Sequence, residues 1–308
     1  MRILIELPTW LGDAVMTTPA IENILLTYPN AKLTLIGSRI AIEALASNPQ
    51  VIKTILINKN FLSLYKESKK IGYFDYFISF RTSFRSKFFK FFVSSAKKYQ
   101  YDKYSYKNQH QVQKYNSFIC ESLQFSRPPL ELTLYIEKQN KSISNPIIGI
   151  NPGASYGSAK RWGPQKFAEV ACKLSSMYDI YIFGSPNEQD AAIEIENYLL
   201  ENGVSNYKNL SGKTTISELM SYISELDLFI TGDSGPMHIA ASFNIPTVAI
   251  FGPTKHNETS QWMNVKSTVI KKTLSCQPCM KRTCPLGHHN CMRLIQPDEV
   301  LNAVNQVN

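Results

Sequence analysis

Short apolar runs alternate with helix-forming segments along most of this 308-residue chain. In the first half, the runs predicted to be strands are 2–7, 32–37, 52–57 and 74–80. The segments between them carry helical periodicity, and helices are expected over 13–28 and around 40–46. Because strands separated by helices are joined by crossover connections, this order predicts an α/β domain with a doubly wound parallel sheet.

The alternation is interrupted once and then restarts. The stretch "EKQNKSISNP" (137–146) is polar, lacks periodicity and ends in proline, which is typical of a linker. Beyond it, the predicted strands are 147–151, 180–184, 228–232 and 247–252. A helix is expected over 164–178, with Pro164 in its first turn. We therefore predict two open α/β domains, at 1–142 and 143–308, with the last helix a candidate to pack back on the first domain.

Composition narrows the classes of partner. Hydrophobic residues make up 44% of the chain and charged residues 19%, as in a globular protein. The net charge of +9 favours anionic partners such as phosphates, acidic sugars or an acidic membrane surface. No apolar run reaches the roughly 20 residues of a membrane span, and the first residues do not resemble a signal peptide. A cytoplasmic protein is expected.

Two loops that follow predicted strands have phosphate-binding character. In "TGDSGPMHIAAS" (231–242), a turn with two glycines leads into a helix, whose first N–H groups can bind an anion. Asp233 and Ser234 are suited either to capping that helix or to bonding a ligand hydroxyl, and His238 lies near its start. In "NPGASYGSAKRW" (151–162), glycines and serines precede Lys160, although the P-loop spacing is absent. Two such loops in one domain favour a diphosphate site over ordinary surface turns.

Two features of the first half allow more than one interpretation. Asp13 follows the loop "PTWLG" (8–12), where an aspartate serves either as a helix cap or as a general base. The segment "FISFRTSFRSKFFKFF" (77–92) is basic and aromatic, with its cations at Arg81, Arg85, Lys87 and Lys90. A helix of this kind binds an anionic membrane or substrate, or it is a core helix with a solvated basic edge.

Four of the six cysteines lie in "CQPCMKRTCPLGHHNC" (276–291), at Cys276, Cys279, Cys284 and Cys291. A C-x2-C pair followed by two cysteines and two histidines has the elements of a zinc site. The spacing of the last two cysteines is irregular for the common zinc folds. Reduced structural thiols are the favoured interpretation, and we predict no metal.

Considered together, these motifs resemble the ADP-heptose:lipopolysaccharide heptosyltransferases of glycosyltransferase family 9. The resemblance is carried, in chain order, by "LPTWLGDAVMTTPAI", "SFRSKFFKFF", "NPGASYGSAKRW", "GDSGPMHIAA" and "CxPCxxxxCPLGHxxCM". It implies a GT-B fold, in which two Rossmann-like domains face a central cleft. It also implies that the first domain binds the acceptor and the second binds the nucleotide sugar. Transfer would invert the sugar carbon, without an obligatory metal or cofactor.

The resemblance also implies roles for single residues. Asp13 matches the proposed catalytic base, and Lys160 matches the lysine that binds the diphosphate. The remaining residues expected to bind the donor, ADP-heptose, are Ser155, Asp233, Ser234, Gly235, Pro236 and His238. Those expected to bind the acceptor are Trp10, Arg81, Ser83, Arg85 and Lys87. The implied acceptor is an anionic glycolipid, heptosyl-Kdo-lipid A, at the cytoplasmic face of the inner membrane, and no nucleic acid is expected.

The chemistry agrees with these residue types. Inverting transfer needs one base for the acceptor hydroxyl and positive groups for the departing diphosphate. No D-x-D metal motif is present. One alternative is a related transferase that uses another nucleotide sugar or acceptor. Another is a basic zinc-containing RNA- or membrane-binding protein, which would leave the two strand-end loops unexplained. A dehydrogenase is disfavoured, because no G-x-G-x-x-G follows a strand.

Overall fold

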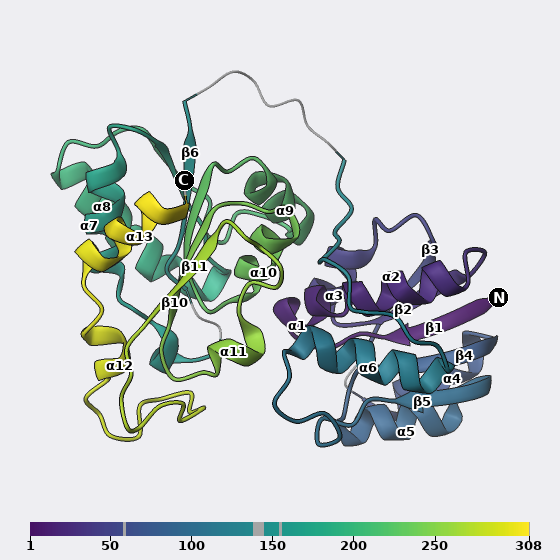
Figure 1. Cartoon of the computed structure of the whole chain (residues 1–308). Helices are drawn as coiled ribbons and strands as arrows, with labels where there is room; N and C mark the ends of the chain where they lie inside the picture. Colours follow the sequence, from purple (N-terminus) through teal and green to yellow (C-terminus); the bar gives the residue numbers. More distant parts are fainter. Residues whose placement is uncertain (58–59, 138–144, 154–155, 308) are drawn as a thin grey trace. The chain divides into compact units, whose positions relative to one another are not determined.

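The computed structural model describes residues 1–57, 60–137, 145–153 and 156–307. The chain divides into two compact units, Met1–Ile136 and Glu137–Asn308. The boundary predicted after residue 142 lies within 138–144, outside the described residues. Figure 1 follows the chain through both units. Within the described part of the chain, no helix has the length and apolarity needed to cross a bilayer.

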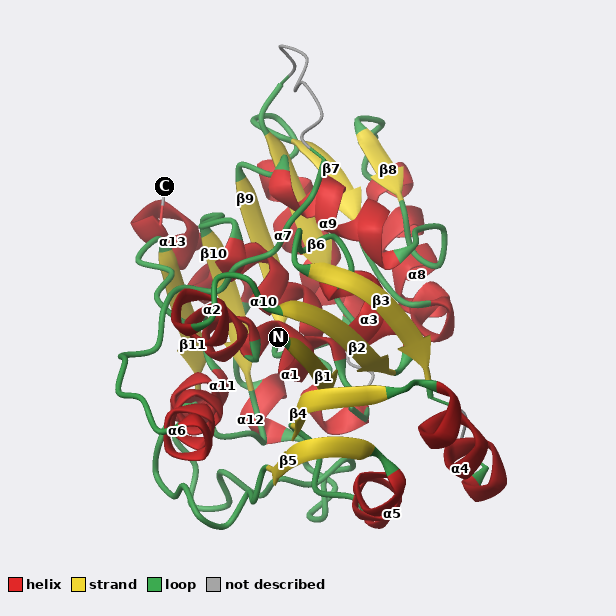
Figure 2. Ribbon diagram, turned by 90° about the vertical axis from the view of Figure 1, so that its right-hand side faces the viewer, coloured by secondary structure: helices red, strands yellow, loops and turns green. Residues whose placement is uncertain are grey.

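The first unit is built on a parallel sheet of five strands, in the order β3-β2-β1-β4-β5 (Figure 2). The strands are β1 (Arg2–Glu6), β2 (Lys32–Gly37), β3 (Val51–Leu56), β4 (Tyr73–Ser79) and β5 (Ser94–Gln100). The helices are α1 (Leu11–Met16), α2 (Thr18–Thr27), α3 (Arg39–Leu45), α4 (Phe61–Lys70), α5 (Phe84–Phe92) and α6 (Gln111–Leu123). The doubly wound architecture predicted for this half is confirmed.

Helices cover both faces of this sheet. On one face, Leu64 of α4 and Phe89 of α5 pack against Phe77 of β4 in a fully buried cluster. The remaining helices belong to the other face, where α2 and α6 lie against each other. There, the buried Asn23 amide donates to the Asn116 side chain at 2.8 Å. The apolar run 2–7 therefore has side chains buried on both faces, as expected for a central parallel strand.

The single helix expected over 13–28 is wrong, because α1 and α2 are separated at Thr17. Pro19 lacks the N–H that would bond to the Val15 carbonyl. That carbonyl instead accepts the Thr18 hydroxyl at 2.8 Å, and the Thr17 hydroxyl donates to the Ala14 carbonyl at 2.6 Å. At its other end, α1 begins at Leu11 rather than at Asp13, so that Asp13 lies within the first turn and Trp10 is the N-cap residue.

The second unit contains a parallel sheet of six strands, in the order β11-β10-β9-β6-β7-β8. The strands are β6 (Ile147–Asn151), β7 (Asp179–Ile182), β8 (Tyr207–Asn209), β9 (Leu228–Gly232), β10 (Thr247–Phe251) and β11 (Ser267–Lys271). The helices are α7 (Pro164–Leu174), α8 (Gln189–Glu201), α9 (Ile216–Ser224), α10 (Gly235–Ser242), α11 (His256–Thr259), α12 (Asn290–Arg293) and α13 (Pro297–Val307), with short 3-10 turns at η1 (Ser158–Lys160) and η2 (Pro186–Glu188).

One large core holds the second unit together. Phe167 of α7, Ile195 of α8 and Val304 of α13 are buried against the β6, β9 and β10 side chains. Helix α7 ends at Leu174, four residues before the predicted end. There, the Ser175 hydroxyl donates to the Cys172 carbonyl at 2.7 Å and competes with continuation of the helix.

The strand order of each sheet reverses at one point between two central strands. In the first unit the order reverses between β1 and β4, and in the second unit it reverses between β6 and β9. Ligands of open α/β sheets bind outside the carboxyl ends of the strands at such a switch point. The four loops that leave these strands are those singled out in the sequence: 7–12 and 80–83 in the first unit, and 152–157 and 233–234 in the second.

Candidate active site

Lys160 and Asp233 meet at the switch point of the second unit. The Lys160 ammonium lies 2.5 Å from Asp233 Oδ2, and both side chains are largely buried. The Thr254 hydroxyl donates to the same carboxylate oxygen at 2.5 Å. Two predicted donor-site residues, separated by 73 positions in sequence, are thus brought together by adjacent strands. The Asp233 side chain makes this ion pair rather than capping α10.

The start of α10 is organised by the end of β6. The Asn151 amide donates to the Thr231 hydroxyl at 3.1 Å and to the Ser234 hydroxyl at 3.0 Å. Ser234 is the N-cap residue, but its hydroxyl makes no capping bond to the helix backbone. Gly235 and Pro236 are the first two residues of α10, and the His238 side chain is buried. This arrangement leaves the Ser234 hydroxyl and the helix start suited to an anion. Ser155 lies outside the described residues.

The cysteine-containing loop, residues 272–289, packs against the loop that carries Lys160. Sequence reasoning did not predict this contact. The Ala159 N–H donates to the Arg282 carbonyl at 3.0 Å, and the Tyr156 hydroxyl donates to the Met280 carbonyl at 2.8 Å. The His289 ring bonds the Ala159 carbonyl at 2.8 Å. In Figure 1, the segment between β11 and α12 forms a long irregular loop. The strand pattern alone could not have placed this loop, because it has no periodicity.

Cys276, Cys279 and Cys284 of this loop and Cys291 of α12 line one small pocket. Backbone N–H groups, first that of His289, lower the pKa of the Cys284 thiol, whereas burial raises that of Cys291. Among the described residues, no group of three or more histidine, cysteine or acidic side chains is arranged to hold a metal ion. The six cysteines of the chain are all described, and none of them forms a disulfide.

In the first unit, Asp13 stands beside the carboxyl end of β1. Its side chain is half-buried in α1, and the Trp10 ring next to it is 46% exposed. Burial, followed by the nearby Asp13 carboxylate, raises the pKa of Tyr115 well above its usual value. Tyr115 comes from α6 and had no signal in the sequence. The Asp13 carboxylate therefore has a phenol in its electrostatic neighbourhood and part of its surface open to solvent.

The loop after β4 is held by a buried carboxylate, Glu6. Its Oε2 accepts the hydroxyls of Ser79, at 2.7 Å, and of Ser86, while Oε1 lies 3.8 Å from Arg81 Nη1. The Gln100 amide closes the network by donating to the Arg81 carbonyl at 3.1 Å. Burial raises the pKa of Glu6, and the hydrogen bonds from the two serines and the charge of Arg81 oppose that rise. In the sequence, the signal for Glu6 was its position as a single acidic residue within an apolar run.

The other predicted acceptor residues lie on α5 or at its start. Ser83 is the N-cap residue, and its side chain accepts the Ser86 N–H at 3.3 Å. Arg85 is half-buried and Lys87 is exposed. Because β4 is the neighbour of β1, this helix start and Asp13 lie at the same edge of the sheet.

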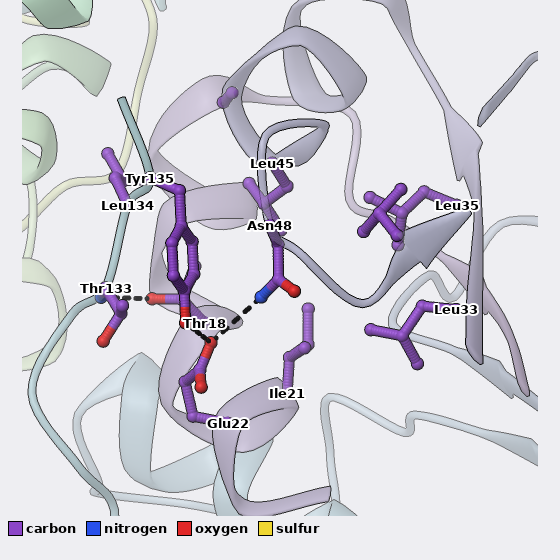
Figure 3. Close-up of a pocket in the computed structure, with 12 residues that line it drawn as sticks. Thr18, Ile21, Glu22, Leu33, Leu35, Leu45, Asn48, Thr133, Leu134 and Tyr135 are labelled. Carbon is purple, nitrogen blue, oxygen red and sulfur yellow. Dashed lines mark hydrogen bonds between the residues drawn. The ribbon is translucent and has the colours of Figure 1, made fainter. Parts of the chain in front are cut away.

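A separate small pocket in the first unit is lined by none of the predicted site residues. Figure 3 shows Glu22 of α2 facing Tyr135 and Asn48 across it. The Tyr135 hydroxyl and the Asn48 amide both donate to Glu22 Oε1, at 3.2 and 3.1 Å. Burial raises the pKa of Glu22, while these two bonds lower it. The contacts tie the end of the first unit to α2, which indicates a structural role.

Known proteins share both the sequence and the fold. The profile of glycosyltransferase family 9 (heptosyltransferase) matches residues 69–290. The lipooligosaccharide heptosyltransferase 2 of Campylobacter jejuni (serotype O:2, strain NCTC 11168) is 43% identical, over 98% of this chain and 96% of that protein. The lipopolysaccharide heptosyltransferase 2 of Escherichia coli K12 is 26% identical, over 99% of this chain and 98% of that protein.

The fold agrees as well. A solved structure of E. coli ADP-heptose LPS heptosyltransferase II superposes with a TM-score of 0.84 at 24% identity, covering 100% of this chain and 98% of that one. The predicted GT-B class, with two Rossmann-like domains, is therefore confirmed. From the profile match and the full-length relative, the chain belongs to glycosyltransferase family 9, the heptosyltransferases.

Proposed function

We propose that this enzyme transfers L-glycero-D-manno-heptose from ADP-heptose to the heptose of the lipopolysaccharide or lipooligosaccharide inner core, the reaction of a heptosyltransferase II. The observation that carries the proposal is the Lys160–Asp233 pair beside the α10 start, at the switch point of the second sheet. Its full-length relatives are named for heptose transfer, and the E. coli structure is named for the ADP-heptose donor.

Asp13 is assigned as the general base. As the acceptor hydroxyl oxygen attacks the anomeric carbon, its proton passes to the Asp13 carboxylate while the bond to the ADP oxygen breaks. A single displacement of this kind inverts the anomeric carbon and needs only one carboxylate. Burial of the neighbouring Tyr115 keeps that phenol neutral, so that it does not compete for the proton.

The departing diphosphate is assigned to the second unit. N–H groups at the start of α10, the Lys160 ammonium and the Ser234 hydroxyl supply the hydrogen bonds that its growing charge needs. Asp233, Gly235, Pro236 and His238 shape this end of the site, and we include Ser155 on resemblance alone. These groups supply the hydrogen bonds without a cofactor, so we propose that none is required.

The acceptor is assigned to the first unit. Trp10, Arg81, Ser83, Arg85 and Lys87 are proposed to bind the phosphates and acidic sugars of heptosyl-Kdo-lipid A. Arginine suits such groups because its planar fork bonds two oxygens at once. The acceptor is a lipid, so we further propose that the enzyme works at the cytoplasmic face of the inner membrane as a peripheral protein.

The decisive experiment offers the purified protein ADP-heptose with a panel of truncated core acceptors and identifies products by mass. We expect a single added heptose on the acceptor that ends in one heptose. If the protein transfers sugar only from another nucleotide sugar, the fold assignment stands and the proposed donor is refuted. Transfer to an acceptor lacking heptose, and not to the heptosylated one, would refute the proposed acceptor.

A further inference from the structure

We propose that Arg282, on the cysteine-containing loop, binds the diphosphate of the sugar donor as a second cation beside Lys160. This inference rests on the proposed donor site and adds to it a residue outside the motifs that identified the site. It also gives the cysteine-containing loop a function, namely to carry Arg282 to the Lys160 loop.

The two cations share one aromatic ring. The Lys160 ammonium lies 4.7 Å from the centroid of the Tyr156 ring, and the Arg282 guanidinium carbon lies 5.4 Å from the same point. The two positive groups are therefore at most about 10 Å apart, by the sum of these two distances. Two phosphate groups joined by one oxygen can occupy such a gap and bond to a cation at each end.

The position of Arg282 is fixed by its backbone. Its carbonyl accepts the Ala159 N–H at 3.0 Å, directly beside Lys160 in sequence. Gly157 approaches the same carbonyl so closely that an added Cβ would lie 2.4 Å from it. The Tyr156 hydroxyl holds the neighbouring Met280 carbonyl. These contacts make the two loops one unit, so Arg282 cannot move away without breaking bonds to the donor loop.

Charge balance favours a second cation at this site. Lys160 is compensated by Asp233 at 2.5 Å, so the pair together brings no net positive charge to a diphosphate. Arg282 is exposed and, among residues 1–57, 60–137, 145–153 and 156–307, it forms no ion pair with an acidic side chain. It is thus an uncompensated cation next to the compensated one. A guanidinium also presents two parallel N–H donors to a phosphate, which an ammonium does not.

The test measures ADP and AMP binding by calorimetry for the wild type, Arg282→Ala and Arg282→Lys. The matched control is Lys281→Ala, which removes an exposed cation from the adjacent position. We expect Arg282→Ala to weaken ADP binding by about tenfold or more, as for a lost charge-assisted hydrogen bond. The affinity for AMP, which lacks the second phosphate, should fall less. Arg282→Lys should restore only part of the lost ADP affinity. Lys281→Ala should bind ADP as the wild type does.

Several outcomes would overturn the inference. One is wild-type ADP affinity in Arg282→Ala, and another is an equal loss for ADP and AMP. If the wild type binds ADP and transfers heptose while Arg282→Ala is unaffected, the inference alone fails. If the folded wild type binds no ADP, both this inference and the proposed donor are refuted. Circular dichroism and melting temperature establish that each variant is folded, and the exposed side chain of Arg282 favours that result.

Discussion

At the scale of single residues, the proposed role of Asp13 as the general base leads to a direct test. It lies within the first turn of α1 rather than at the N-cap. We expect Asp13→Asn to lower kcat by roughly a hundredfold or more, because the amide cannot accept the acceptor proton. ADP affinity and melting temperature should change little. The exposed Glu131→Gln serves as the control, and near-normal turnover in Asp13→Asn would refute the assignment.

Glu22 allows a prediction of pH dependence. Burial raises its pKa above 4.5, so the folded state holds the proton more tightly than the unfolded state. The stability gained from this proton is therefore present at low pH and lost as pH rises through the folded-state pKa. Glu22→Gln keeps an acceptor for Tyr135 and Asn48 without the charge. We expect it to exceed the wild type in stability at about pH 7, by about 1 kcal/mol or less, and to lose that advantage near about pH 4.

Urea unfolding at both pH values measures this difference. The Tyr135→Phe variant is a useful comparison, because it removes one hydrogen bond and leaves the carboxyl in place. An advantage for Glu22→Gln that is the same at both pH values would contradict the argument, since the burial penalty exists only for the ionised form.

At the scale of elements, most strands and the site loops were predictable, whereas the edge strands β5, β8 and β11 and the long loop were not. Apolar runs identified the central strands, because both of their faces are buried. β5, with the sequence "SSAKKYQ", is a polar edge strand, and β8 has three residues, so neither carries the pattern. Lys160 and Asp233 were predictable one by one. Their pairing required the strand order, and the contact between Arg282 and Tyr156 required the fold of a loop without periodicity.

The start of α5 is the element on which acceptor binding is predicted to depend. Arg81 and Arg85 flank a turn held by Glu6, and the Arg81 guanidinium lies 3.8 Å from the Glu6 carboxylate. We expect Arg81→Ala/Arg85→Ala to raise the acceptor KM about tenfold or more and to reduce its salt dependence, with the donor KM nearly unchanged. Glu6→Gln should raise the acceptor KM in the same direction by a smaller factor.

The control for this double variant is Lys32→Ala. Lys32 is an exposed cation at the first residue of β2, the opposite end of the sheet from the candidate site. Steady-state kinetics with each substrate varied in turn separates the two KM values. A loss of donor affinity, or a comparable effect of Lys32→Ala, would show that the arginines act through overall charge or stability rather than through acceptor contacts.

At the scale of the whole molecule, both sheets place their functional loops by one rule. Each sheet reverses its strand order once, and the candidate residues follow the two strands on either side of that point. The first unit places an acid and cations there, and the second places an ion pair and a helix start. The same architecture thus presents different side chains in the two halves, because the loops vary while the buried strands are restricted to apolar side chains.

The net charge of +9 is accompanied by an exposed aromatic surface on α5. Phe84 and Phe91 are 75% and 76% exposed, and Lys87 between them is also exposed, on the same helical face. Burial and then the charges of Lys90 and Lys69 lower the pKa of Lys98, so cations are crowded beside this face. Aromatic side chains within a basic surface suit the interface of an anionic bilayer.

We therefore expect the protein to sediment with vesicles that contain anionic phospholipid, to release from them as salt rises, and to ignore neutral vesicles. Phe84→Ser/Phe91→Ser should weaken vesicle binding about tenfold, since both rings lose their burial in the interface. Val265→Ser, at a position 93% exposed in the second unit, should bind as the wild type does. Heptose transfer to a lipid-free acceptor should be unchanged in the double variant. Equal binding by the double variant and the wild type would place the membrane contact elsewhere, and salt-independent binding would show that charge does not drive it.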